Sequence, residues 1–234
     1  MMNQANTETI PVDLQALTAW MDDIGLERGP LSNLQLLAGG TQNILLRFDR
    51  GGREFVLRRP PLHLRKNSNE TMKREARILE ALSATDVPHP RFIAGCDDEA
   101  VLGTCFYLMA PVEGFNPANG LPQLHASDPA IRARMGYSYI EGMAALGAVD
   151  YKAVGLEGFG KPDGFLQRQT GRWMSQLEGY AAFDEWTGFK ELPDVERIVA
   201  WLEDNLPQDF TSGIFHGDCH LANTMFAPDS PELV

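Results

Sequence analysis

The sequence predicts an α+β protein in two parts, a small β-rich half followed by a mostly helical half. Three observations lead to this expectation. Short apolar runs separated by Gly-containing turns occupy residues 34–110, which is typical of strands. Longer segments with apolar residues at helical spacing occupy residues 128–206. A stretch rich in Pro, Gly and Asn, residues 111–122, separates them, so we expect an N-terminal lobe over 1–111 and a C-terminal lobe over 112–234.

The N-terminal half is expected to contain two helices and five strands. In both helices apolar residues recur three or four positions apart, and the first three strands are joined by turns that contain Gly-Gly. In chain order the segments are a helix at 12–24, strands at 34–38, 43–48 and 54–59, a helix at 69–84, and strands at 91–96 and 104–110. After the stretch at 111–122 we expect mostly helices, at 128–147, about 164–182 and 193–206.

The composition is that of an ordinary globular protein, with 44% hydrophobic and 22% charged residues among 234. A net charge of −12 argues against general binding to nucleic acid or to an anionic membrane, and we expect neither as a partner. The three cysteines are too far apart for a zinc-knuckle spacing and fit reduced thiols. With no signal-peptide pattern and no apolar run of membrane length, we expect a cytoplasmic protein.

Positive charge is concentrated in one segment of this acidic chain. Residues 47–77 hold ten of the 20 Lys and Arg residues but only four acidic residues, a local net charge of +6. Such a segment would suit a small polyanion such as a nucleotide, or it would simply be a solvated charged surface.

The turn AGGTQN, residues 38–43, is a candidate phosphate-binding loop. Glycines between two strands let the backbone approach a ligand closely and present N–H groups to phosphate oxygens. An ordinary turn is the alternative. The candidate nucleotide-binding residues of this loop are Gly39, Gly40, Thr41, Gln42 and Asn43.

A cation and an acid follow on the next two elements. Arg58 lies near the end of the third expected strand, and Glu75 lies early in the next helix on the face that also carries Met72 and Leu79. An ion pair between Arg58 and Glu75 would hold the guanidinium against phosphate oxygens. The alternative is that Glu75 lies on the surface among its basic neighbours.

The strand YLMA and the following PVEG, residues 107–114, are expected to join the two lobes. Pro111 has no N–H, so the Ala110 carbonyl and the Val112 N–H would be the backbone partners of a nucleotide base there. The alternative is a linker without a binding role.

The segment FHGDCHLAN, residues 215–223, allows three interpretations. On a strand, His216, Asp218 and His220 would share one face, as in the metal site of a hydrolase. On a loop, Asp218 would be a base and Asn223, five residues later, a magnesium ligand. The third interpretation is a polar turn without a functional role. The order of glycine loop, cation, helix glutamate, joining strand and Asp/Asn pair favours a phosphotransfer site. The metal-hydrolase interpretation leaves the glycine loop, Arg58, Glu75 and Asn223 unused.

These motifs together resemble the aminoglycoside phosphotransferase (APH) family of small-molecule kinases, which have a two-lobe, protein-kinase-like fold. The family signature H-G-D-x-H-x-x-N is matched in full by residues 216–223, and the stretch at 154–173 is similar to the branch associated with acyl-CoA dehydrogenases. The resemblance extends from about residue 32 to the last residue.

The resemblance implies an enzyme that uses ATP and Mg²⁺ to phosphorylate a hydroxyl group of a small molecule. Asp218 would be the catalytic base, His216 would brace its loop, and Asn223 would bind magnesium. Arg58 would hold the phosphates with Glu75 as its partner. The acceptor would be aminoglycoside-like, or a hydroxyacyl compound or CoA ester.

The chain departs from the family pattern in three places. Gln42 replaces the usual serine of the glycine loop, and Gly147 stands where a histidine is expected near the end of the long helix. A second metal-binding aspartate is expected shortly after Asn223, but the chain ends at SPELV. We therefore expect a truncated C-terminal lobe in a nearly inactive, poorly stable chain, unless Asp229 or Glu232 replaces that ligand. A nucleotide-binding pseudokinase or inactive fragment is the alternative to an active kinase.

Overall fold

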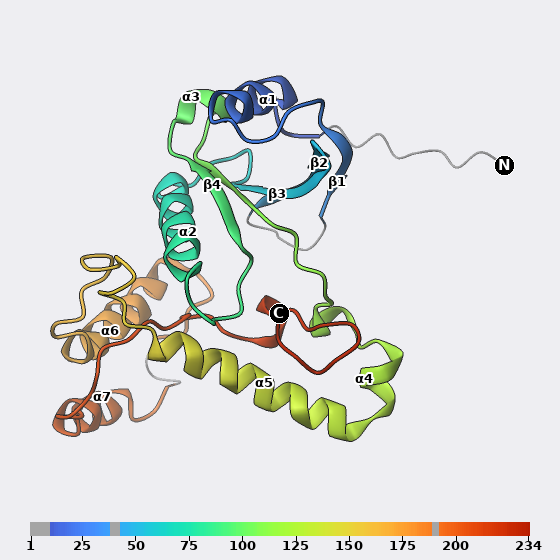
Figure 1. Ribbon diagram of the computed structural model, residues 1–234. Coiled ribbons are helices and arrows are strands. Elements are labelled where there is room, and N and C mark those ends of the chain that lie inside the picture. The colour runs from blue at the N-terminus through green and yellow to red at the C-terminus, as the bar shows by residue number, and fades with distance from the viewer. Residues whose placement is uncertain (1–9, 38–42, 189–191) are drawn as a thin grey trace. The chain divides into compact units, whose positions relative to one another are not determined.

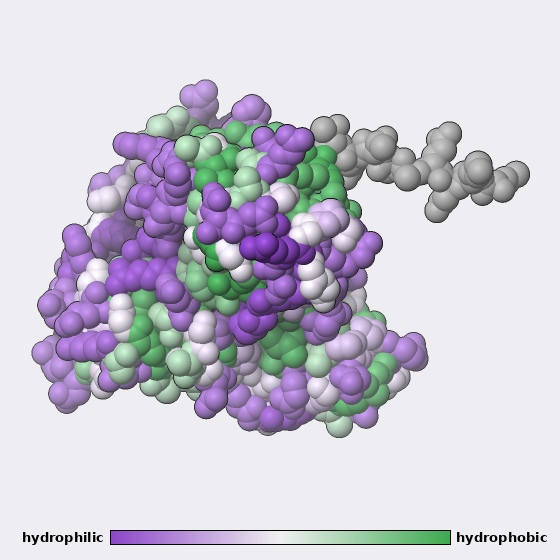
Figure 2. Space-filling model, turned by 45° about the horizontal axis from the view of Figure 1, so that its top comes forward, coloured by the Kyte–Doolittle hydropathy of each residue, from purple (hydrophilic) through white to green (hydrophobic). Residues whose placement is uncertain are grey.

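The computed structural model describes residues 10–37, 43–188 and 192–234, and the chain divides into two compact units (Figure 1). The first unit comprises Met1–Asp150 together with Phe215–Val234, and the second comprises Tyr151–Ile214. In the described ranges, no helix is both long enough and apolar enough to span a membrane. Figure 2 shows polar residues over most of the face in view, with apolar residues exposed in several patches.

A five-stranded antiparallel sheet forms the N-terminal part of the first unit, with strand order β1-β2-β3-β5-β4. The expected α+β fold is confirmed, and each expected strand and helix of this part is present with bounds shifted by a few residues. The short helix α3 was not expected. The elements are α1 (Leu14–Asp23), β1 (Ser32–Leu36), β2 (Ile44–Arg50), β3 (Arg53–Arg59), α2 (Ser68–Leu82), β4 (Phe92–Cys96), α3 (Glu99–Leu102) and β5 (Phe106–Met109).

The two faces of the sheet carry separate clusters of buried residues, because successive side chains of a strand point to opposite faces. On one face, Phe55 and Leu57 of β3 pack with Leu17 and Met21 of α1. On the other face, Met72 of α2 packs against buried side chains of β5 and the residue before it. The alternation of β3 therefore places Arg58 on the face covered by α2.

A buried arginine fixes α1 to the sheet. Arg50, at the end of β2, is 1% exposed and forms an ion pair with Asp22 of α1. Its guanidinium also donates to the backbone carbonyl oxygens of Gly29 (3.0 Å) and Thr18 (3.3 Å). Burying a charge is favourable only when the charge is paired and hydrogen-bonded, and these contacts meet that condition.

Helices and one short hairpin complete the first unit. Beyond the sheet come η1 (Pro117–Asn119), α4 (Gln123–Ser127), α5 (Pro129–Ala148) and, after the second unit, η5 (Leu221–Asn223). The helix α5 begins where Asp128 Oδ1 accepts a hydrogen bond from Ala130 N (2.8 Å). Phe226 forms β-bridges with both Phe115 and Leu233, so the end of the chain lies beside the segment that follows β5.

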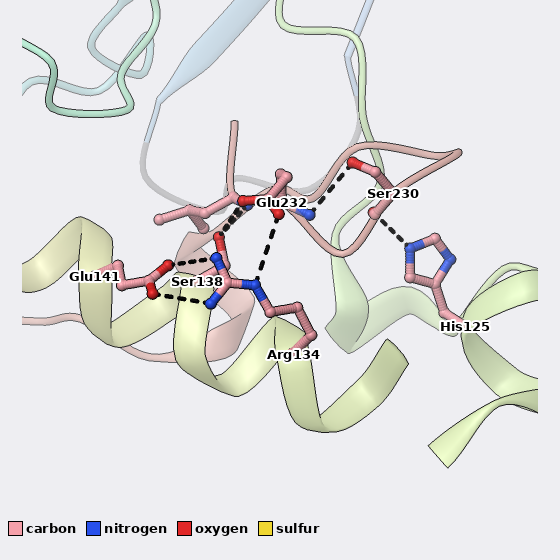
Figure 3. A network of polar contacts seen from close by, with 7 residues as sticks. His125, Arg134, Ser138, Glu141, Ser230 and Glu232 are labelled. Carbon is pink, nitrogen blue, oxygen red and sulfur yellow. Dashed lines mark hydrogen bonds and ion pairs between the residues drawn. The ribbon is translucent and has the colours of Figure 1, made fainter. Parts of the chain in front are cut away.

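The last residues are hydrogen-bonded to α5 (Figure 3). The Ser138 hydroxyl donates to Glu232 Oε2 (3.2 Å) and accepts from Leu233 N (2.9 Å). Arg134 lies 3.8 Å from Glu232 Oε1 and makes two 2.8 Å hydrogen bonds to Glu141. These contacts join the end of the chain to α5 and leave the Glu232 side chain 52% exposed.

A glycine allows the close approach of Phe226 to the segment after β5. A Cβ added at Gly114 would lie 2.8 Å from the Phe226 carbonyl oxygen and 3.0 Å from Val234 Cγ2. We expect Gly114→Ala to lower the free energy of unfolding by roughly 1–3 kcal/mol, as overpacking does. Urea denaturation checks this.

Gly136→Ala is the matched control for that substitution. Gly136 lies within α5 with nothing within 4 Å of the added Cβ, so we expect a gain of roughly 0.5–1 kcal/mol from helix propensity. Equal unfolding free energies for Gly114→Ala and the unmodified protein would contradict the packing described above.

The second unit is helical, as expected. It contains η2 (Leu166–Arg168), α6 (Gln169–Gly179), η3 (Tyr180–Ala182) and α7 (Val195–Asp204). The Thr170 hydroxyl of α6 donates to Glu203 of α7 (2.9 Å), which joins the two helices.

Candidate active site

Arg58 and Glu75 form the ion pair that the sequence pattern suggested. Arg58 Nε lies 2.9 Å from Glu75 Oε2, and a second nitrogen, Nη2, lies 3.5 Å from Oε1. The pairing arises because β3 turns Arg58 toward α2 and the helix turns Glu75 toward the sheet. The Arg58 side chain is 28% exposed.

A buried tyrosine extends this pair. Tyr107 of β5 is directly opposite Arg58 in the sheet, and its hydroxyl donates to Glu75 Oε2 (3.2 Å). Burial raises the pKa of Tyr107, so the hydroxyl stays protonated and keeps donating at neutral pH. Glu75 is thus held by two partners, which fixes the position of the guanidinium.

The candidate glycine loop joins β1 and β2. Gly39, Gly40, Thr41 and Gln42 lie outside the described residues. Asn43 is half-buried and immediately precedes β2. The flanking backbone is paired where Leu37 N donates to Leu45 O (3.0 Å), so the loop connects adjacent antiparallel strands as predicted.

The segment after β5 is held to the sheet on both sides of Pro111. The Ala110 N–H donates to Arg91 O (2.8 Å). On the other side, Arg47 Nη2 of β2 donates to Glu113 Oε1 (2.9 Å). Val112 lies between these anchors and is half-buried.

Residues 216–223, which we call the Asp–Asn loop, bring Asp218 and Asn223 into contact. Asn223 Nδ2 donates to the Asp218 backbone oxygen (3.0 Å) and to Asp218 Oδ2 (3.1 Å). The chain turns at Gly217, which has φ of +81°, a conformation that glycine adopts without strain. It then enters η5, which places the two side chains on the same side of the loop.

The two histidines of the loop contact Asp218 and Asn223. His216 Nδ1 accepts from the Asp218 N–H (3.3 Å), and His220 Nε2 lies 3.2 Å from Asn223 Nδ2. Since the amide nitrogen of Asn223 is used in these contacts, the amide oxygen points away from Asp218. The Asp218 side chain is 77% exposed, so a substrate can reach its carboxylate.

The metal-hydrolase interpretation loses its structural basis. It required residues 216–220 to form a strand with three side chains on one face, but these residues form a loop. In the ranges that the structure describes, no group of three or more His, Cys, Asp or Glu side chains is arranged to hold a metal ion.

Two residues that the sequence analysis did not single out contact the Asp–Asn loop. The Tyr139 hydroxyl of α5 donates to the Cys219 carbonyl oxygen (2.7 Å), and Asn116 Nδ2 donates to the Ala222 carbonyl oxygen (2.6 Å). Hydrogen bonding with the Cys219 side chain, with some desolvation, raises the pKa of Tyr139, which keeps it a donor. No short sequence motif signals such contacts.

Comparison with known proteins gives a family match over most of the chain. The model of the phosphotransferase enzyme family (APH) matches residues 33–234. Acyl-CoA dehydrogenase family member 11 of Gallus gallus is 31% identical over 200 residues, which are 84% of this chain and 24% of that protein. Acyl-CoA dehydrogenase family member 10 of Mus musculus is 30% identical over 81% of this chain and 18% of its own length. The chain thus spans a quarter or less of these relatives.

Solved structures show the same fold. A "putative aminoglycoside phosphotransferase" from Ralstonia eutropha has 32% identity and a TM-score of 0.74, covering 95% of this chain and 63% of its own. Aminoglycoside phosphotransferase APH(4)-Ia, solved with AMP-PNP and hygromycin B, has 16% identity and a TM-score of 0.61. The match covers 93% of this chain and 68% of that chain. The second likeness concerns the fold alone.

Proposed function

Because the chain belongs to the phosphotransferase enzyme family, we propose that it transfers the γ-phosphoryl group of ATP to a hydroxyl group of a small molecule. Residues 1–111 would bind the nucleotide, and residues 112–234 would supply the Asp–Asn loop. The observation that carries the proposal is the contact between Asp218 and Asn223 on an exposed loop. This pair combines an accessible base with an amide oxygen of the type that binds magnesium. A reaction that consumes ATP suits the cytoplasm, which is the location that we propose.

In the proposed reaction, Asp218 accepts the proton of the acceptor hydroxyl as the hydroxyl oxygen attacks the γ-phosphorus. The bond from the γ-phosphorus to the bridging oxygen breaks, and its electron pair leaves with ADP. Asn223 Nδ2 donates to Oδ2 of the carboxylate, and His220 Nε2 lies 3.7 Å from Oδ1. His216 keeps the backbone of the loop in place by accepting from the Asp218 N–H.

The nucleotide would be held by residues of the sheet and of the segment after β5. Arg58 would donate to phosphate oxygens, since Glu75 and Tyr107 fix its guanidinium and leave part of it exposed. The Ala110 carbonyl and the Val112 N–H would bind the base. Gly39, Gly40, Thr41, Gln42 and Asn43 would surround the phosphates.

Asn223 offers one oxygen of the type that binds Mg²⁺, a neutral amide that would need a charged ligand beside it. Asn223 would hold the ion through its amide oxygen, which the contacts of its nitrogen direct away from Asp218. When bound, Mg²⁺ would neutralise charge on the β- and γ-phosphates.

For the acceptor, we favour a hydroxyacyl compound or its CoA ester over an aminoglycoside. This preference rests on the names of the relatives, which are acyl-CoA dehydrogenase family members, and on the similar stretch at 154–173. An aminoglycoside-like acceptor remains the second candidate, because the first solved structure above carries that name.

An acceptor panel tests the proposal. The protein is incubated with Mg·ATP and, separately, with a hydroxyacyl-CoA, the corresponding free hydroxy acid, hygromycin B or ethanolamine. The sequence predicts low turnover for this chain, and we expect whatever ADP release it shows to rise most with the hydroxyacyl compounds, with a phosphorylated acceptor found by mass spectrometry. Binding of ATP without ADP release on any acceptor would instead support a pseudokinase. Stoichiometric zinc in protein purified without chelator, with hydrolysis that needs no ATP, would support a metal-dependent hydrolase.

A further inference from the structure

In the part of the chain that the structure describes, two side chains from outside the Asp–Asn loop donate to its backbone carbonyls. Within the loop, hydrogen bonds join Asp218 and Asn223 to each other and to the two histidines. These internal bonds set the relative positions of the side chains but not the position of the loop in the molecule. The side chains of Tyr139 and Asn116 provide that attachment, at 2.7 Å and 2.6 Å.

The position of the two carbonyls is the first reason to give these bonds a role. Tyr139 donates to the carbonyl of Cys219, the residue immediately after Asp218. Asn116 donates to the carbonyl of Ala222, the residue immediately before Asn223. Each anchor therefore fixes a peptide group next to one of the two proposed functional residues.

The donors are themselves held in place, which is the second reason. Tyr139 lies within α5, a helix of 20 residues. Asn116 Oδ1 accepts from Ala118 N (2.8 Å), so both ends of its amide are used and the orientation of the amide is determined. The neighbouring Phe115 exchanges two backbone hydrogen bonds with Phe226, each of 2.9 Å.

We infer that Tyr139 and Asn116 are positioning residues that fix the Asp218 carboxylate relative to the reacting hydroxyl. The inference rests on the proposed function, since it assigns these residues to the same reaction. Neither side chain takes part in proton transfer. Each holds the loop at a distance at which the carboxylate accepts the proton, and small displacements of a catalytic group are costly to rate.

Tyr139→Phe is the first test, because it removes the donating hydroxyl and keeps the ring. We expect kcat for ADP release from Mg·ATP to fall roughly ten- to a hundred-fold, with the KM for ATP unchanged. Tyr137→Phe is the matched control, because Tyr137 lies on the same helix and is 67% exposed, and it should leave kcat unchanged. Asn116→Ala should lower kcat in the same way, with Asn119→Ala as its control.

A double-mutant cycle separates positioning from general stability. If Tyr139 acts through Asp218, Tyr139→Phe should lower kcat much less in the Asp218→Asn background than in the unmodified protein. An equal fall in both backgrounds, an unchanged kcat in Tyr139→Phe, or a rise in KM alone would overturn the inference.

Amide hydrogen exchange of residues 216–224 provides a readout that does not depend on turnover. We expect faster exchange there in Tyr139→Phe and in Asn116→Ala than in the two controls. If the unmodified protein released no ADP with any acceptor, the proposed function would fail on its own, while the exchange would still report on the anchors. Unchanged exchange in both variants would show that the two bonds do not hold the loop.

Discussion

Asp218→Asn is expected to lower kcat by roughly 10²–10⁴-fold, because an amide does not accept the proton that the carboxylate takes from the acceptor hydroxyl. The substitution keeps the shape of the side chain and an oxygen that can accept from Asn223 Nδ2. We therefore expect the affinity for ATP to stay nearly the same. Steady-state kinetics and equilibrium binding of ATP measure the two effects separately.

Asp209→Asn is the matched control for this variant. Asp209 is an exposed acid to which no role is assigned, and its substitution should leave kcat unchanged. Near-normal turnover by Asp218→Asn would remove Asp218 from the role of base. A parallel loss of ATP affinity and turnover would instead indicate a nucleotide-binding role.

Arg58→Ala is expected to weaken the binding of ATP much more than the binding of adenosine, because Arg58 is proposed to meet the phosphates. Charge-assisted hydrogen bonds of this kind contribute roughly 1.5–3 kcal/mol, which corresponds to about a 10- to 150-fold change in the dissociation constant. Calorimetric titration with each ligand measures the difference.

The controls for Arg58→Ala address the fold of the sheet. Arg53→Ala, at the opposite end of β3, should change the affinity for neither ligand. Glu75→Gln should also weaken the binding of ATP, but less than Arg58→Ala does. It removes the charge that holds the guanidinium while keeping a hydrogen-bond acceptor. Equal losses for ATP and adenosine in Arg58→Ala would mean that Arg58 only supports the structure.

The sequence predicted the fold well, because patterning and local spacing determine most of it. The period of two in β3 places Phe55 and Leu57 on one face and Arg58 on the other. The helical period then places Glu75 of α2 toward Arg58, so the ion pair followed from two local patterns. The family signature at 216–223 likewise identified the loop on which Asp218 and Asn223 meet.

Long-range contacts to backbone groups were not predictable. Tyr139 and Cys219 are 80 residues apart, and Asn116 and Ala222 are 106 apart. A hydrogen bond to a backbone carbonyl requires no particular side chain at the accepting residue, so it leaves no pairing pattern in the sequence. Glu232, which was considered as a replacement metal ligand, contacts Ser138 and Arg134 of α5, and these side-chain contacts also join residues too far apart for a local pattern to show them.

Phosphorus NMR of the complete reaction tests the central claim most directly. The protein, Mg·ATP and the acceptor found by ADP release are followed together, with Asp218→Asn in parallel. The account predicts a new phosphomonoester signal that grows in equal amount with ADP and is nearly absent in Asp218→Asn. Inorganic phosphate as the only new product, or the same phosphomonoester formed at an equal rate by Asp218→Asn, would contradict it.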